Sequence, residues 1–258
     1  MMLITGGLLF SGIVAGMVVS MIGGKAPVVV AKPVAPSPVV KDPQRTEAEL
    51  ISEAEALARK FLNASTVDEM LGTLRNPDLA ESRMRAFYPE GKIEAPGMSQ
   101  FNSGAALVTR GKLHSFSVLT RDHEEKSLAF IETPQGLRID WESWVGWSDI
   151  PWKEFLSTKP AGSHVFRVIL ASVDYYNFGF ADDTKWQSYR LESPDGEHSV
   201  YGYAEKNSPL SAKLRPSAGD QAVLMTLALK FPPDARSGSQ VEIERLVCEG
   251  WVEEGGPP

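Results

Sequence analysis

A long apolar stretch at the start of the chain predicts a membrane span. The first charged side chain is Lys25, and residues 3–22 are almost continuously apolar. About 20 such residues cross the hydrocarbon core of a bilayer as a helix, and backbone groups in lipid must find their partners within that helix. The sequence therefore predicts a single transmembrane anchor over residues 1–24. A cleaved signal peptide is the alternative, although a basic segment before the apolar stretch and an A-x-A cleavage site are both missing.

Small residues recur every four positions within this span, at Gly12, Gly16 and Ser20. This spacing leaves a groove along one side of a helix and is typical of membrane helices that pack closely together. Helix packing through these three residues, and with it a homodimer, is therefore a hypothesis for the anchor.

A proline-rich segment follows the span. Residues 26–43 read APVVVAKPVAPSPVVKDP, and their five prolines leave no helical or strand period. Such a segment is typical of extended polyproline II structure and acts as a semi-rigid spacer, so residues 25–43 are predicted to be a linker. Its lysines favour a cytoplasmic body by the positive-inside rule, whereas a long tether behind an anchor is typical of an envelope protein. We expect an extracytoplasmic body and leave the cytoplasmic orientation open.

Amphipathic helices are predicted at the start of the body that follows the linker. Residues 46–49 read TEAE, a capping box, and apolar residues then recur at helical spacing as far as Leu62. Residues 66–69 repeat the capping signature, and Asn76–Pro77 places a proline at the first position of a third helix. Three short helices need a surface on which to bury their apolar faces, so we expect a sheet beside them.

A first group of strands is predicted after these helices. Residues 112–120 and 127–132 are rich in β-forming side chains, and TPQG at residues 133–136 is a turn sequence. Residues 137–141 are expected to return as the hairpin partner. A short helix is predicted at residues 151–156.

A second group of strands is predicted after a chain break at residues 159–162. Its last strand changes apolar parity near Arg245, which predicts a β-bulge there. The expected order is three strands, one helix and two strands, at residues 165–175, 185–191, 199–204, 209–214, 223–231 and 241–252.

These patterns together predict an α+β fold with five parts. The parts are a transmembrane anchor (1–24), a proline-rich linker (25–43), a domain of helices packed on an antiparallel sheet (44–158), a small mainly-β domain of five strands and one helix (159–252), and a tail (253–258).

The order of the elements resembles two known folds. Helices followed by a curved antiparallel sheet, over residues 44–158, resemble the cone-shaped nuclear transport factor two-like superfamily, which implies a pocket between helix and sheet. The order over residues 163–252 is similar to the OB-fold. The runs LRNPDLAESRMRAFY and DWESWVGW also resemble an uncharacterised family of membrane-anchored bacterial proteins. A resemblance in element order is an analogy of fold, and it carries no activity by itself.

Charge and cysteine content narrow the range of functions. The formal net charge of −7 argues against a nucleic-acid partner, because phosphate-binding surfaces need clustered Lys and Arg. Cys248 is the single cysteine, which excludes an intramolecular disulfide and paired-thiolate metal sites. The four histidines are scattered without metal-ligand spacing, and common catalytic motifs are missing from the body. We therefore predict no catalytic residue, no metal site and no cofactor.

Tryptophan is concentrated in one segment, DWESWVGWSDIPW at residues 140–152. We interpret its indoles mainly as core and as a plug between the two predicted domains, because such large rings dominate whatever core they join. A ligand-binding face that includes Trp141, Trp144 and Trp147 is the alternative.

Asp140 has the most informative neighbour of the acidic residues, because Trp141 follows it. An indole can desolvate a carboxylate and raise its pKa, which suits a general base. On a strand, however, Asp140 would share the outer face with Arg138 and point away from the apolar face. We therefore expect a solvated acid that pairs with Arg138.

The sequence is typical of a non-catalytic interaction or structural protein, tethered to the membrane of a bacterial envelope, with a protein or glycan partner. A small-ligand pocket in the first domain, with or without enzymatic activity, is one alternative function. Glycan binding through exposed aromatic residues is the other. The candidate ligand-binding residues are Asp140, Trp141, Trp144, Trp147, Tyr175 and Tyr176.

Overall fold

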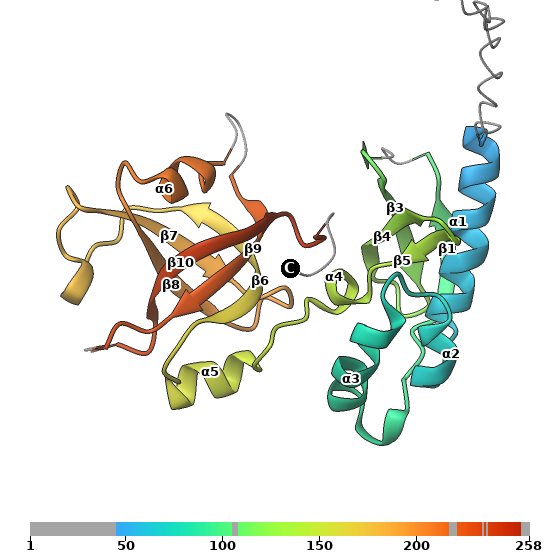
Figure 1. Ribbon diagram of the computed structural model, residues 1–258, viewed down its shortest axis with the longest axis horizontal. Coiled ribbons are helices and arrows are strands. Elements are labelled where there is room, and N and C mark those ends of the chain that lie inside the picture. The colour runs from blue at the N-terminus through green and yellow to red at the C-terminus, as the bar shows by residue number, and fades with distance from the viewer. Residues whose placement is uncertain (1–44, 105–107, 217–220, 234, 236, 254–258) are drawn as a thin grey trace, which may run out of the picture. The chain divides into compact units, whose positions relative to one another are not determined.

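Figure 1 shows the computed structural model, which describes residues 45–104, 108–216, 221–233, 235 and 237–253. The predicted anchor, with its small residues Gly12, Gly16 and Ser20, and the predicted linker lie outside these residues. Within the described part, no helix is both long and apolar enough to cross a membrane. The described elements are helices and mostly antiparallel strands, which confirms the predicted α+β class.

Three helices begin the described chain, as the sequence predicts. Thr46 caps the first of them: its hydroxyl accepts the Glu49 amide at 3.3 Å, and the Glu49 carboxylate accepts the Thr46 amide at 2.9 Å. Asn76 precedes the third helix without a side-chain cap bond, and Pro77 lies in its first turn. The helices are α1 (Glu47–Leu62), α2 (Val67–Leu71) and α3 (Pro77–Phe87), followed by a 3₁₀ turn at Pro89–Gly91.

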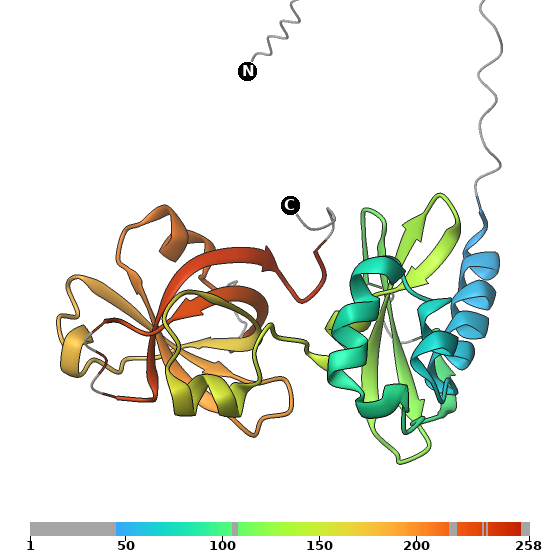
Figure 2. The ribbon, with the colours of Figure 1, turned by 60° about the horizontal axis from the view of Figure 1, so that its bottom comes forward.

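The first sheet is antiparallel, with strand order β1–β3–β4–β5 and with β2 also paired to β3. Side chains alternate along β3, so Phe116 and Val118 are buried while Ser115 and Ser117 point to the other face. Helix α1 runs along the sheet (Figure 2) and contacts β1 and β5. The strands are β1 (Met98–Asn102), β2 (Val108–Arg110), β3 (Leu113–Thr120), β4 (Glu125–Thr133) and β5 (Gly136–Ile139).

One hydrophobic core lies between these helices and the sheet. Phe61 of α1, Met84 of α3 and Phe130 of β4 are fully buried in it. The capped helices therefore bury their apolar faces on the sheet, as their short length requires.

The predicted strand at residues 137–141 ends earlier in the structure. Strand β5 ends at Ile139, and helix α4 (Trp141–Val145) begins directly after Asp140. The Asp140 carboxylate accepts the Ser143 amide at 2.7 Å and caps the helix, and Gly146 ends it with a φ of 62°. The strand prediction for Trp141 is wrong. The apolar alternation continues through this residue in the sequence, but the Asp140 cap starts a helix at Trp141.

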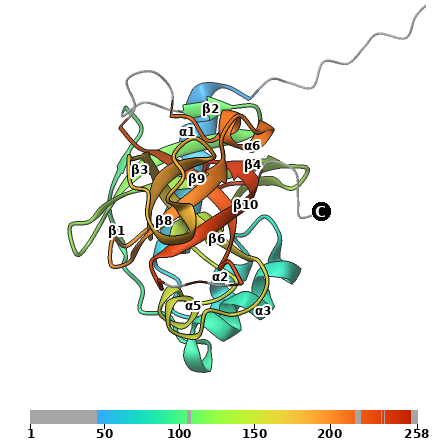
Figure 3. The same cartoon turned by 90° about the vertical axis from the view of Figure 1, so that its left-hand side faces the viewer.

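The second sheet is a closed barrel with strand order β10–β8–β7–β6–β9 (Figure 3). Neighbouring strands are antiparallel except β8 and β10, which run parallel where Tyr201–Tyr203 pairs with Gln240–Glu242. The predicted order of elements is confirmed, as is the bulge beside Arg245. The elements are β6 (His164–Ser172), a 3₁₀ turn (Phe178–Phe180), β7 (Trp186–Glu192), β8 (Ser199–Glu205), α6 (Pro209–Lys213), β9 (Val223–Lys230) and β10 (Gln240–Glu249).

A second hydrophobic core fills the barrel. Phe166, Leu191 and Leu227 are fully buried in it. Helix α5 (Trp152–Thr158), which the sequence predicts, adds Trp152 and Phe155 to the same core. The division of the body into two domains at residue 159 stays a prediction.

Removal of residues 1–43 is expected to leave a soluble, folded fragment, because the capping box at Thr46 starts the first described helix and its apolar face is buried in the first core. Circular dichroism and gel filtration of residues 44–258 test this. The same fragment carrying Thr46→Ala should fold but lose about 1 kcal/mol of unfolding free energy. Aggregated or unfolded material from the unmodified fragment would contradict the predicted boundary.

Candidate functional site

Asp140 is fully buried, which corrects the expectation of a solvated acid paired with Arg138. Its Oδ2 lies 2.7 Å from Nε of Arg75, and its Oδ1 accepts the Ser143 amide. Neither atom of the Arg75–Asp140 contact has a further hydrogen-bond partner in the described part of the chain. Both carboxylate oxygens therefore serve the fold, one in an ion pair and the other in a helix cap.

Trp141 belongs to the first core. Its side chain is fully buried, and its indole Nε1 donates a hydrogen bond to the Tyr88 hydroxyl at 3.3 Å. The ring of Phe87 meets it edge-on, with centroids 5.5 Å apart. A fully buried indole with a satisfied N–H has no surface left for a ligand.

Trp144 and Trp147 are half-buried at the edge of the same core. The guanidinium of Arg83 lies 4.1 Å from the ring centroid of Trp147 and covers one of its faces. Trp144 meets Phe61 edge-on at 5.9 Å on its inner side, and the ammonium of Lys126 lies 5.3 Å from its ring centroid. Of the tryptophans predicted as ligand-binding, Trp144 is the one that also borders cavities.

Arg167, on β6, is buried where the tryptophan segment meets the barrel. Its Nη1 donates to the Trp147 carbonyl at 2.9 Å and its Nε donates to the Trp251 carbonyl at 2.8 Å. Burial lowers the pKa of Arg167, while the charges of Asp140 and Glu142 raise it. The segment is therefore joined to the barrel by a buried cation, in addition to the indoles that the sequence predicts as a plug.

Tyr175 and Tyr176 lie in the connection between β6 and β7 and are half-buried. Tyr175 stacks on Tyr201 of β8 with ring centroids 3.9 Å apart and planes 20° apart. The ammonium of Lys206 lies 5.9 Å from the ring centroid of Tyr176. Other residues of the barrel thus cover part of each ring, which reduces the surface available to a sugar.

A groove of about 980 Å³ borders α4. We call it the α4 groove. Trp144 and Val145 of α4 line it, together with residues of β3 and β4 on the sheet face away from the core and residues near the ends of β9 and β10. Its large apolar side chains are Phe87, Leu113, Trp144, Val145, Leu224, Trp251 and Val252.

Two of the three exposed large hydrophobic residues found in the described ranges line this groove. Phe87 is 49% exposed and Leu224 is 47% exposed. Sequence reasoning missed both. Leu224 carries a usable signal, because it is an apolar residue at the outward-facing parity of β9, between the buried-parity positions Val223 and Met225. Phe87 has no such signal, because it fits the apolar face of α3.

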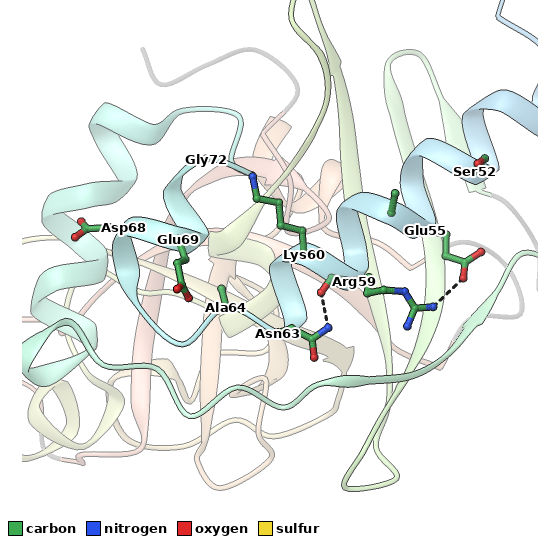
Figure 4. Close-up of a pocket in the computed structure, with 10 residues that line it drawn as sticks. Ser52, Glu55, Arg59, Lys60, Asn63, Ala64, Asp68, Glu69 and Gly72 are labelled. Atoms are coloured by element: carbon green, nitrogen blue, oxygen red, sulfur yellow. Dashed lines mark hydrogen bonds and ion pairs between the residues drawn. The ribbon is translucent and has the colours of Figure 1, made fainter.

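A second concave surface lies between α1 and α2 (Figure 4) and measures about 1010 Å³. Several of its polar side chains already have hydrogen-bond partners: Arg59 donates to Glu55 at 3.0 Å, and the Asn63 amide donates to the Arg59 backbone carbonyl at 2.8 Å. Among the residues that the structure describes, no large apolar side chain lines it. It has the character of a solvated helix surface, whereas ligand sites are mostly apolar with a few polar groups.

A small pocket of about 160 Å³ opens beside the turn that joins β3 to β4. Trp144 separates it from the α4 groove, since this residue lines both cavities. Among the described residues, no three His, Cys, Asp or Glu side chains gather in a metal-binding arrangement. Burial raises the pKa of the Cys248 thiol, which is half-buried.

Comparisons of the chain with protein-family models, with curated proteins and with solved structures find no match.

Proposed function

We propose that this protein is a non-catalytic, membrane-tethered interaction protein that binds a protein partner in the α4 groove. The observation that carries the proposal is the pair of exposed apolar side chains, Phe87 and Leu224, which line the same groove as Trp144. Exposed apolar residues are normal when scattered singly, but a contiguous group with a polar rim is typical of an interaction site.

The composition of the groove supports a protein partner. Protein interfaces place aromatic and aliphatic side chains at the centre and charged ones at the rim. Here the rim includes the ion pairs Arg110–Glu249, at 3.6 Å, and Lys126–Glu124, at 2.9 Å. Trp144 suits the role of an energetic hot spot, because it is held in place by Phe61 and borders the cavity.

The tether is part of the same proposal. The apolar residues 3–22 and the proline-rich residues 26–43 support an anchored body held away from a bilayer. We place the body on the outer side of a bacterial membrane, as an envelope protein, and homodimerisation through the span remains a hypothesis for that part of the chain.

The finer fold assignments also belong to this proposal. We infer an OB-like topology for the barrel, supported by its closure through a parallel β8–β10 pair and by helix α6 between the third and fourth strands. For the first sheet, helix α1 packed along it supports a resemblance to the nuclear transport factor two-like cone.

Glycan binding by the barrel has less support. OB-folds bind oligosaccharides and oligonucleotides on the face of their second and third strands, which are β7 and β8 in this topology. Here the chain's own side chains cover that face. Phe180 stacks on Tyr203 with ring centroids 4.0 Å apart, and Tyr175 stacks on Tyr201. The chain's own aromatic side chains thus occupy the places that ligand rings would take.

Site-specific photocrosslinking tests the groove. A benzophenone side chain at Phe87 or at Leu224, in the full-length protein in its native membranes, should crosslink one and the same partner. Phe178 is the matched control, because it is 51% exposed, against 49% and 47% for the groove positions, but does not line the groove. Equal adducts from all three positions, or none from the groove positions, would contradict the proposal.

The substitution Trp144→Ala should weaken this crosslinking by reducing partner affinity at least tenfold, as expected when a hot-spot indole is removed. The crosslinker at Leu224 measures the effect, because that side chain comes from β9, whereas the substitution lies in α4. A Trp144→Ala protein that folds and crosslinks as well as the unmodified chain would exclude this residue from the interface.

A further inference from the structure

The small pocket beside the β3–β4 turn has the size of a site for one small organic molecule. Its volume is about 160 Å³, and an apolar cavity of about 150 Å³ in another protein holds one benzene molecule. The inner lining is apolar or aromatic and comes from α1, α2 and the segments after α3 and β5: Phe61, Leu62, Met70, Tyr88, Ile93 and Trp144.

The opening of the pocket carries more negative than positive side chains. Glu94, Asp122 and Glu124 are exposed there, and Lys126 is the cation among the lining residues. Lys126 pairs with Glu124 at 2.9 Å. A side chain of Arg121 lies across Gly97 beside the opening, and even with this second cation the carboxylates remain in excess.

Two of these carboxylates are available to a cationic ligand. A hydrogen bond donated by Thr120 lowers the pKa of Asp122, so its carboxyl is ionised at neutral pH. Glu94 makes no ion pair or side-chain hydrogen bond with other residues in the described ranges. An ammonium group at the opening would therefore meet the carboxylate of Glu94, which has no cationic partner in the described ranges, and the carboxylate of Asp122, on which the charge of Lys126 also acts.

We propose that this pocket binds a small primary amine with an aromatic or branched apolar body. The apolar body lies against the half-buried side chains of Tyr88, Pro96 and Trp144, where it replaces water, because deeper lining residues such as Phe61 have almost no exposed surface. The ammonium group stays at the opening, near Glu94 and Asp122, and the ring of Tyr88 favours a cation beside it, whereas Trp144 already has Lys126 beside its ring. The proposal does not rest on the α4 groove function, because an amine can bind here without a protein partner, although Trp144 lines both cavities.

Three ligands of the same size test the charge requirement. Benzylamine, benzyl alcohol and benzoate share one ring and differ in the charge of the group that would reach the opening. Saturation-transfer NMR on the full-length chain in lipid nanodiscs, with empty nanodiscs as the blank, ranks their binding. We expect benzylamine to bind most tightly, benzyl alcohol more weakly and benzoate least. Equal binding of benzoate and benzylamine, or no binding of benzylamine, would overturn the proposal.

Two substitutions locate the site. Glu94→Gln should weaken benzylamine binding about threefold to fivefold, as expected for one exposed ion pair, and should leave benzyl alcohol binding unchanged. Glu55→Gln, on the surface between α1 and α2, is the matched control and should change neither. Ile93→Phe fills the pocket and should abolish binding of both ligands. If that variant does not fold, the Glu94→Gln comparison decides, and an unchanged benzylamine affinity would refute the site.

Discussion

Replacement of Trp141 by alanine is expected to lower the unfolding free energy of the body by about 3 to 5 kcal/mol, the usual cost of removing a fully buried large aromatic side chain. The indole is 0% exposed, contacts Phe87 edge-on and donates a hydrogen bond to Tyr88. The substitution therefore leaves a large cavity and an unpaired hydroxyl. Urea denaturation of the 44–258 fragment, followed by circular dichroism, measures the change.

Trp147→Ala is the matched control for this substitution. Trp147 comes from the same segment but is half-buried, with Arg83 over its ring, so its removal should cost distinctly less. The same holds for Trp144, although the plug interpretation of the sequence predicts a loss of about 3 to 5 kcal/mol for Trp144→Ala and for Trp147→Ala alike. A loss below about 1 kcal/mol for Trp141→Ala would show that the segment does not form part of the core.

Asp140→Ala should have a comparable effect, about 3 to 5 kcal/mol, because it leaves the charge of Arg75 without its buried partner. The alanine also removes the cap of α4. Asp140→Asn separates the two contributions, since asparagine is also a good cap residue but carries no charge. We expect Asp140→Asn to retain most of the loss.

An exposed ion pair provides the comparison for Asp140. Glu55 and Arg59 lie 3.0 Å apart on the solvent side of α1, with side chains about half exposed. Glu55→Gln should change the unfolding free energy by less than about 1 kcal/mol. If Asp140→Asn is as mild as Glu55→Gln, the Arg75–Asp140 contact contributes little to stability.

Local signals in the sequence predict most elements of the body. The capping box at Thr46, the turn at residues 133–136 and the alternation around Met225 each depend on neighbours within a few residues, and the structure confirms the corresponding elements. The helix after Asp140 shows the limit of this reasoning. Alternation of Leu137, Ile139 and Trp141 indicates a strand. However, the Asp140 carboxylate accepts the amide of Ser143, three residues later, and this cap starts a helix that ends the strand.

The candidate site depends on contacts between residues far apart in the sequence, and these could not be predicted. Arg75 and Asp140 lie 65 positions apart in the sequence, and nothing in their spacing indicates their pairing. Phe87 and Leu224 likewise lie in different elements, and it is the fold that brings both to the α4 groove. Of the tryptophans predicted as ligand-binding, Trp144 borders the α4 groove, whereas Trp141 is buried in the core.

The shared wall between the α4 groove and the small pocket has a thermodynamic consequence. Trp144, Lys126 and Glu124 line both cavities, so an occupant of one cavity fixes side chains that the occupant of the other must also meet. Binding at the two places is then linked. By thermodynamic reciprocity, whatever factor an amine in the pocket applies to the affinity of the groove for its partner, the partner applies the same factor to the affinity of the pocket for the amine. The body that we propose to be tethered would in this way report a small molecule to a protein through the positions of the Trp144 indole and the Lys126 ammonium group.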